Sequence, residues 1–186
     1  MIDIRAATVD DANTLATIYA PYVVMNVVSF ESEPPRVEEV RSRIEEAGDT
    51  YPWLIAADEA SGIILGYARS KPFRASQAYR WTVELAVYTA GDFDGKGINR
   101  TLLGALIATL TAQNFRQAIY TVPLPNDKFV QLYEGVGFQR AGHHRQIIHR
   151  GDQWGDVGIW QRELSQTPGT PEEPLPFSSV GVIRPT

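Results

Sequence analysis

The chain has 186 residues, enough for one domain with a substantial core but not comfortably for two. Its 17 Lys and Arg against 22 Asp and Glu give a net charge of −5, which disfavours a sequence-independent nucleic-acid binder because phosphate repels an acidic surface. The lack of cysteine excludes a disulfide scaffold, a thiolate metal site and a cysteine nucleophile. No apolar run approaches the roughly 18 residues of a membrane span, and the first residues lack a signal-peptide core, so we expect a soluble, cytoplasmic protein without a membrane partner.

The first half of the chain carries strand and helix patterns in alternation. A capping box at Thr8-x-x-Asp11 predicts the start of a helix, and a second helix is expected from Val37 to about Ala47. The strands predicted here are Ile2–Ala6, Trp53–Ala57, Ile63–Ser70 and, as the strongest strand signal of the chain, Thr82–Thr89.

The second half continues the alternation. Leucines and isoleucines at helical spacing predict a helix from Gly97 onward, and a strand follows over Ala118–Val122. Asn126 is a natural N-cap for a helix over Asp127–Gly135. Two last strands are expected near Phe138–Gln146 and Asp156–Arg162. The order βααβββαβαββ predicts an α/β (α+β) fold in which helices flank a mixed sheet.

The C-terminal segment differs from the rest of the chain. From Ser165 to Thr186 it is rich in proline and shows no periodicity, so we expect an extended tail without a core of its own. The predicted organisation is therefore a folded domain over residues 1–164 and a Pro-rich tail over residues 165–186.

Seven segments, in the same order and spacing, make the chain resemble the GNAT acetyl-CoA-dependent N-acetyltransferases, and within them the phosphinothricin N-acetyltransferase-like branch. They are IRAAT (4–8), VSFESEP (28–34), YPWLIA (51–56), AYRWTVE (78–84), LPND (124–127), YEGVGF (133–138) and WGDVGIWQR (154–162). The resemblance covers roughly residues 2–164. It implies a mostly antiparallel, twisted sheet that is splayed at its centre, acetyl-CoA bound in the splay, and a homodimer.

The turn from Asp94 to Arg100 is the candidate phosphate site. A helix N-terminus presents unpaired N–H groups, and small residues there let a pyrophosphate reach the backbone. Gly97 matches the first glycine of the family pattern. Asp94 stands where the family has Gln or Arg, and Asn99 where it has Gly or Ala, and both changes act against tight CoA binding. With the strand that holds the pantetheine arm in the family, the expected cofactor-binding residues are Leu85, Ala86, Val87, Tyr88, Gly95, Lys96, Gly97, Ile98, Asn99, Arg100 and Asn126.

Acetyl transfer to an amine needs a base for the ammonium and a proton donor for the departing thiolate. The resemblance assigns Glu84 as the base, acting directly or through water. It assigns Tyr133 as the acid, although the nearest branch usually has His at this position. Without the family resemblance, the sequence favours a solvent-facing strand residue for Glu84. The alternative for Tyr133 is an aromatic core residue on an amphipathic helix.

The acceptor pocket is expected to contain Phe30, Arg74, Tyr79, Arg80 and Thr82, with Arg74 meeting a carboxylate in bidentate geometry. Ser76 replaces a second basic residue of the branch. No metal site is expected, because neighbouring histidines in a strand, His143 and His144, point to opposite faces.

The predicted function is N-acetylation of a small amino-acid-like substrate of the phosphinothricin or methionine sulfoximine type, by direct attack in a ternary complex. Two alternatives stay open. One is an acetyltransferase for another amine, such as a polyamine or a protein N-terminus. The other is a catalytically impaired GNAT-fold module that binds CoA or a ligand.

Overall fold

The computed structural model describes residues 1–25, 28–93, 95–150, 152–166 and 168–184. Its strands are β1 (Ile2–Ala6), β2 (Trp53–Asp58), β3 (Ile64–Pro72), β4 (Thr82–Thr89), β5 (Gln117–Leu124), β6 (Gln139–Arg150) and β7 (Gln153–Glu163). Its α-helices are α1 (Ala12–Val24), α2 (Val37–Ala47), α3 (Ile98–Ala112), α4 (Asp127–Glu134) and α5 (Phe177–Val180). Within the described ranges, no helix is both long and apolar enough to cross a membrane.

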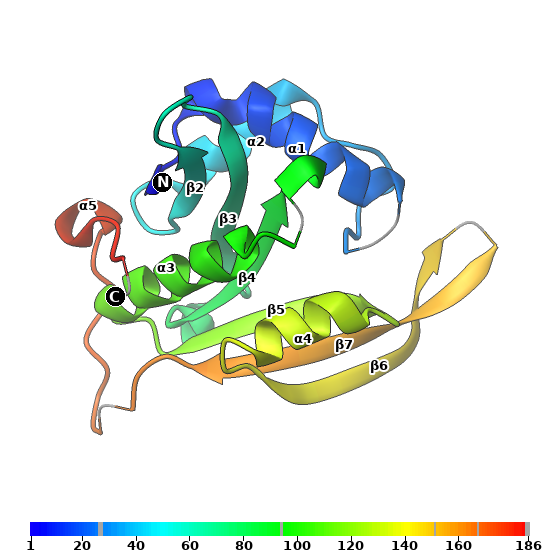
Figure 1. Cartoon of the computed structure of the whole chain (residues 1–186). Helices are drawn as coiled ribbons and strands as arrows, with labels where there is room; N and C mark the ends of the chain where they lie inside the picture. The colour runs from blue at the N-terminus through cyan, green and yellow to red at the C-terminus, as the bar shows by residue number, and fades with distance from the viewer. Residues whose placement is uncertain (26–27, 94, 151, 167, 185–186) are drawn as a thin grey trace.

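One sheet organises the fold, with the strand order β1-β2-β3-β4-β5-β7-β6. The neighbouring strands run antiparallel except for β4 and β5, which are parallel. The parallel pair is joined through α3, since parallel neighbours need a crossover connection. The predicted mixed, mostly antiparallel sheet with flanking helices is confirmed (Figure 1).

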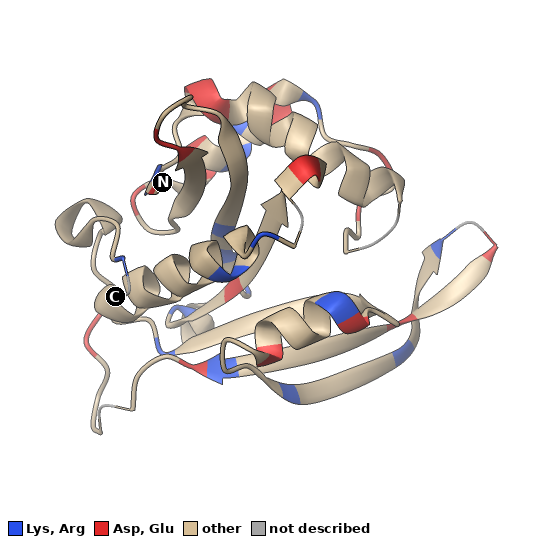
Figure 2. Cartoon of the chain, in the orientation of Figure 1, with Lys and Arg blue, Asp and Glu red and all other residues tan. Residues whose placement is uncertain are grey.

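Helices cover the sheet on both sides. The helix α3 packs on β2, β3 and β4, and its leucines Leu102, Leu103, Leu106 and Leu110 are completely buried. On the opposite face of these strands lies α1, with α2 packed against it (Figure 1). The helix α4 lies along β5 and β7 (Figure 1). Lys and Arg are interspersed with Asp and Glu over these elements rather than gathered on one of them (Figure 2).

Most predicted elements are confirmed, and the differences lie at their ends. The helix over Val37–Ala47 is confirmed residue for residue. The capping box at Thr8 opens a short 3₁₀ turn, Val9–Asp11, and α1 begins after it. The last two strands are longer than predicted, because β6 and β7 continue as an arm that projects from the body (Figure 1).

The C-terminal segment lies on the body and includes the short helix α5, which the sequence did not predict. Near its middle, the buried amide of Gln113 donates to the Leu175 carbonyl (2.9 Å), and the Ser178 hydroxyl donates to Asp49 (2.5 Å). Nearer its end, the Ile183 amide donates to the Thr109 hydroxyl (3.0 Å). These contacts hold the segment against α3 and the loop after α2.

Candidate active site

The parallel strands at the centre of the sheet separate after three residues. They pair as Thr82–Gln117, Val83–Ala118 and Glu84–Ile119, whereas β4 continues to Thr89 and β5 to Leu124. From Glu84 onward the two strands therefore diverge, and the predicted splay at the centre of the sheet is confirmed.

Beyond the fork, alternate residues of β4 turn their backbone polar groups toward the gap. The Ala90 amide donates to Leu65 of β3 (2.9 Å), while the Thr89 amide and carbonyl point the other way and bond the Tyr22 hydroxyl (3.0 and 2.9 Å). Hydrogen-bonding direction alternates along a strand, so Val87 and Leu85 face the same way as Thr89. A ligand that mimics a strand can pair with these groups.

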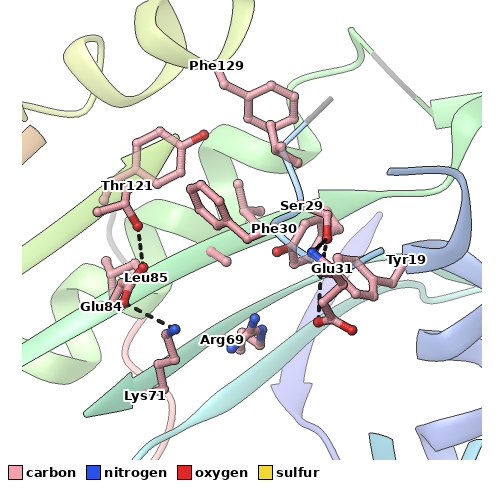
Figure 3. Close-up of a pocket in the computed structure, with 15 residues that line it drawn as sticks. Tyr19, Ser29, Phe30, Glu31, Arg69, Lys71, Glu84, Leu85, Thr121 and Phe129 are labelled. Carbon is pink, nitrogen blue, oxygen red and sulfur yellow. Dashed lines mark hydrogen bonds and ion pairs between the residues drawn. The ribbon is translucent and has the colours of Figure 1, made fainter. Parts of the chain in front are cut away.

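A cavity of about 210 Å³ lies at the fork. The same face of β3 and β4 contributes Arg69, Lys71 and Glu84 to its wall, and the side chains of Phe30 and Phe129 lie across it (Figure 3). An apolar cover over a few convergent polar groups is typical of a small-molecule site.

Glu84 stands at the point where the strands part. Its carboxylate accepts a hydrogen bond from the Thr121 hydroxyl of β5 (2.5 Å) and pairs with the Lys71 ammonium of β3 (3.2 Å). Lys71 is its direct cross-strand neighbour, so the register itself creates the ion pair. The Glu84 side chain is 19% exposed. It is thus a fixed carboxylate that still reaches the cavity.

A second polar group closes the other end of the cavity. The Tyr19 hydroxyl lies 2.7 Å from the Ser29 hydroxyl and donates to Glu31 (3.1 Å), and both nitrogens of the Arg43 fork bond the same carboxylate (2.9 and 3.1 Å). Burial raises the pKa of Tyr19, so its hydroxyl stays protonated and serves as a donor. This network fixes the loop that carries Phe30.

A hollow of about 310 Å³ opens at the N-terminus of α3. Gly95 (φ +78°) and Gly97 (φ +80°) are in the left-handed conformation, and a Cβ on either would meet no atom within 4 Å. The backbone is therefore open to a ligand at the positive end of the helix. Arg100 and Lys128 line the hollow, which makes it suited to an anion.

Comparisons with known proteins agree with this geometry. The model of the acetyltransferase (GNAT) domain matches residues 4–159. The chain belongs to the GNAT acetyltransferase family. It is 34% identical to the phosphinothricin N-acetyltransferase of Streptomyces viridochromogenes, over 96% of each chain. It is 30% identical to the L-methionine sulfoximine/L-methionine sulfone acetyltransferase of Pseudomonas paraeruginosa, over 90% of this chain and 98% of the relative. The GNAT phosphinothricin acetyltransferase of Sinorhizobium meliloti, solved in complex with acetyl-CoA, superposes with a TM-score of 0.86 at 32% identity, over 92% of this chain and 94% of that one.

Many residues that the GNAT resemblance selected lie at the two openings. The cavity is lined by Phe30, Glu84, Leu85, Ala86, Val87 and Tyr88. The hollow is lined by Gly95, Gly97, Ile98, Asn99 and Arg100. Lys96 does not line it, and its ammonium lies 4.9 Å from the centre of the Phe93 ring. Asp94 lies outside the described residues. The Asn99 side-chain oxygen is buried without a partner in the described structure.

Four of the expected acceptor residues do not line the cavity in the described part of the chain. The Arg80 guanidinium stacks on Trp81 (3.5 Å) and pairs with Glu173 of the C-terminal segment (3.0 Å). Arg74 is exposed, over the Phe73 ring. Tyr79, which is 40% exposed, packs edge-on against that ring, and Thr82 lies at the start of β4. Arg74, Tyr79 and Arg80 belong to the segment between β3 and β4. The role of all four residues toward an acceptor stays a prediction.

The two expected residues of α4 are fixed by the helix itself. Asn126 caps it, its oxygen accepting from the Phe129 amide (3.4 Å). Tyr133 is completely buried and stacks on Tyr120 of β5, with 3.4 Å between the ring centres. The hydroxyls of both tyrosines lack a hydrogen-bond partner among the described residues, and only Tyr120 lines the cavity. The role of Tyr133 as an acid thus stays a prediction.

Sequence reasoning missed several residues of the cavity, among them Tyr19, Arg69, Lys71 and Thr121. The sequence contained a signal for two of these residues. Arg69 and Lys71 alternate at the end of an otherwise apolar strand, which places both charges on one face. Tyr19 and Thr121 carried no such signal, because their position depends on how α1 and β5 pack.

Proposed function

We propose that the chain transfers the acetyl group of acetyl-CoA to the amino group of a small amino-acid-like acceptor. The observation that carries the proposal is Glu84, a fixed carboxylate at the fork, directly before backbone groups that β5 leaves unpaired. Similarity to acetyltransferases for phosphinothricin and methionine sulfoximine supports the acceptor class.

The residues present fit acetyl-CoA along its length. Leu85 and Val87 turn their backbone amides and carbonyls toward the gap, where an extended amide-containing arm can bond them like a strand. The left-handed glycines leave the backbone at the start of α3 accessible to a pyrophosphate, and Arg100 and Lys128 line the same hollow. The donor therefore reaches from the hollow to the fork.

In the proposed reaction, Glu84 takes a proton from the acceptor ammonium, directly or through water, and the free amine attacks the thioester carbonyl. The amide N–H groups of Leu85 or Val87 face the developing oxyanion. The C–S bond of the adduct then breaks and Tyr133 supplies a proton to the thiolate. The second proton that the nitrogen loses passes through water and restores the Tyr133 hydroxyl. Burial raises the pKa of Tyr133 well above its ordinary value, which keeps its hydroxyl protonated. The attack is direct, in a ternary complex.

The test is a thiol-release assay with acetyl-CoA over amino acids, sulfoximines, phosphinates and polyamines. The proposal predicts turnover with the amino-acid-like acceptors, and at least about a 100-fold loss in Glu84→Gln, as is typical when a general base is removed. Glu59→Gln, an exposed change in the turn after β2, is the matched control and keeps full activity. Failure of acetyl-CoA to bind at millimolar concentration contradicts the proposal.

The homodimer and the cytoplasmic location belong to the same proposal. The family resemblance supports the homodimer, and the composition of the chain supports the cytoplasmic location. Sedimentation of the purified protein at several concentrations tests the first, and fractionation of cells tests the second.

A further inference from the structure

One cation at the cavity wall forms no ion pair in the described structure. The cavity and the pocket beside it are lined by three cations, Arg43, Arg69 and Lys71, and by three carboxylates, Glu31, Glu46 and Glu84. Glu31 is held by Arg43 in a bidentate pair, and Glu84 is paired with Lys71. Among the described residues no carboxylate pairs with Arg69. The wall therefore carries one cation without an anion.

Arg69 is partly buried and held in place by aromatic side chains. Its guanidinium hydrogen-bonds the Tyr88 hydroxyl and lies 5.5 Å from the centre of the Trp53 ring. Burial lowers the pKa of Arg69, but the tyrosines around it, Tyr88 first, outweigh this and raise it, so the group stays charged. A guanidinium has five N–H donors. One hydrogen bond to Tyr88 leaves most of its fork for a ligand.

The strand register sets Arg69 at a suitable distance from Glu84. Lys71 pairs with Glu84 across the two strands, and Arg69 pairs with Ala86. Arg69 therefore lies on the same face of the sheet as Glu84. It is displaced from Glu84 by two residues, or about 6.8 Å, along the strand direction. In an α-amino acid the nitrogen is two bonds from the carboxyl carbon. One such molecule can meet Arg69 with its carboxylate and Glu84 with its ammonium. Figure 3 shows Arg69 between the Glu84–Lys71 pair and the Tyr19–Glu31 group.

We propose that Arg69 binds the carboxylate of the acceptor and thereby selects α-amino acids over amines without a carboxylate. The inference rests on the proposed function and names the acceptor contact for it. Carboxylate recognition is then built into β3, inside the cavity. A polyamine is disfavoured, because its second ammonium would meet an unpaired guanidinium.

The experiment measures acceptor binding without turnover. The full chain, saturated with free CoA, is titrated calorimetrically with L-methionine sulfone and with its carboxamide, which lacks the negative charge. The wild type is expected to prefer the carboxylate by about 10- to 150-fold, the range for hydrogen bonds to a charged group. Arg69→Gln is expected to abolish this preference, and Arg69→Lys, which keeps the charge but loses the fork, to retain part of it. Arg41→Gln, which changes an exposed arginine of α2 outside the cavity, is the matched control and retains it fully.

Any of four results overturns the inference. The first is an unchanged preference in Arg69→Gln, including equal weakening of both probes, because a purely structural arginine would act in this way. The others are a lost preference in Arg41→Gln, a wild type that does not distinguish the two probes, and a wild type that binds neither. Thiol release with acetyl-CoA separates this test from that of the proposed function. Preferential binding through Arg69 without thiol release sustains the inference and contradicts the acetyltransferase proposal.

Discussion

Replacing Gly97 by alanine tests whether a ligand contacts the turn before α3. The backbone strain that alanine introduces there can be matched by the same change at a second glycine. Gly97 has φ +80° and lines the hollow at the start of α3, and a Cβ there meets no protein atom within 4 Å. Gly62, in the turn between β2 and β3, has φ +70° and equally open surroundings but lines neither the cavity nor the hollow. The two variants therefore carry the same backbone strain and differ only in what the new methyl group approaches.

The expected magnitudes follow from this match. An L-residue in the left-handed region loses roughly 1–2 kcal/mol, partly offset by about 0.4–1 kcal/mol from the less flexible unfolded chain. Both variants should lose about 1 kcal/mol of unfolding free energy, or about 2–4 °C in Tm for a chain of this length. In Gly97→Ala the methyl group also blocks approach to the open amides. Loss of one hydrogen bond to a charged group is about 1.5–3 kcal/mol, so the Kd for acetyl-CoA should rise by about 10- to 150-fold.

The assay pairs thermal unfolding with calorimetric titration of acetyl-CoA. The expected result is similar Tm values for the two variants and weakened acetyl-CoA binding in Gly97→Ala only. Equal affinities in Gly97→Ala and Gly62→Ala would refute the assignment of this hollow to the pyrophosphate. A much lower Tm for Gly97→Ala would refute the premise that the two glycines are equally strained.

Three further predictions concern the sheet, the proposed acid and acid stability. Gly66→Ala should lower the free energy of unfolding, measured in urea, by about 1–3 kcal/mol, because its Cβ would lie 2.6 Å from the Tyr88 carbonyl oxygen. Gly142→Ala is the control and should have little effect, since its Cβ would lie 3.5 Å from the nearest atom. Tyr133→Phe should lower kcat by about 100-fold without lowering Tm, because the lost hydroxyl is buried and unpartnered; an unchanged kcat removes Tyr133 from the reaction. The hydrogen bond from Arg5 lowers the pKa of Asp11 in the folded protein. The ionised Asp11 carboxylate therefore stabilises the fold above the pKa of Asp in the unfolded chain, which is near 4. This stabilisation is lost as the pH falls through the lower pKa that Asp11 has in the folded protein. Asp11→Asn should therefore flatten the decline of Tm below about pH 4, and an unchanged decline contradicts the assignment.

Local patterns were sufficient for most of the fold. The strand Thr82–Thr89 and the helix over Val37–Ala47 carry strong periodic signals, and both are confirmed at the predicted bounds. The projecting arm of β6 and β7 was underestimated, because its exposed residues have no buried face to impose a pattern. The helix α5 was missed for a different reason: it has only four residues and lies against the body.

The candidate site was predictable where it depends on the backbone and less so where it depends on packing. The two glycines follow from a strand, a turn and a helix in sequence, whereas Glu84 was selected through the family resemblance. The structure places Glu84 at the cavity and the glycines at the hollow. The alternation of Arg69 and Lys71 places both charges on one face of β3. Their position beside Glu84 depends on the register of β3 against β4, which no local pattern fixes, so both were missed. Arg80 was predicted to meet the acceptor, but the described structure pairs it with Glu173, almost a hundred residues away in the chain.

Amide hydrogen exchange resolved to single residues, with and without acetyl-CoA, tests whether the fork between β4 and β5 holds the acetyl donor. We expect the amides of Leu85 and Val87, which face the gap, to gain protection on binding, while those of Ala86 and Tyr88, which face β3, change little. If acetyl-CoA binds and the amides of Leu85 and Val87 exchange as fast as before, the donor does not lie in the fork.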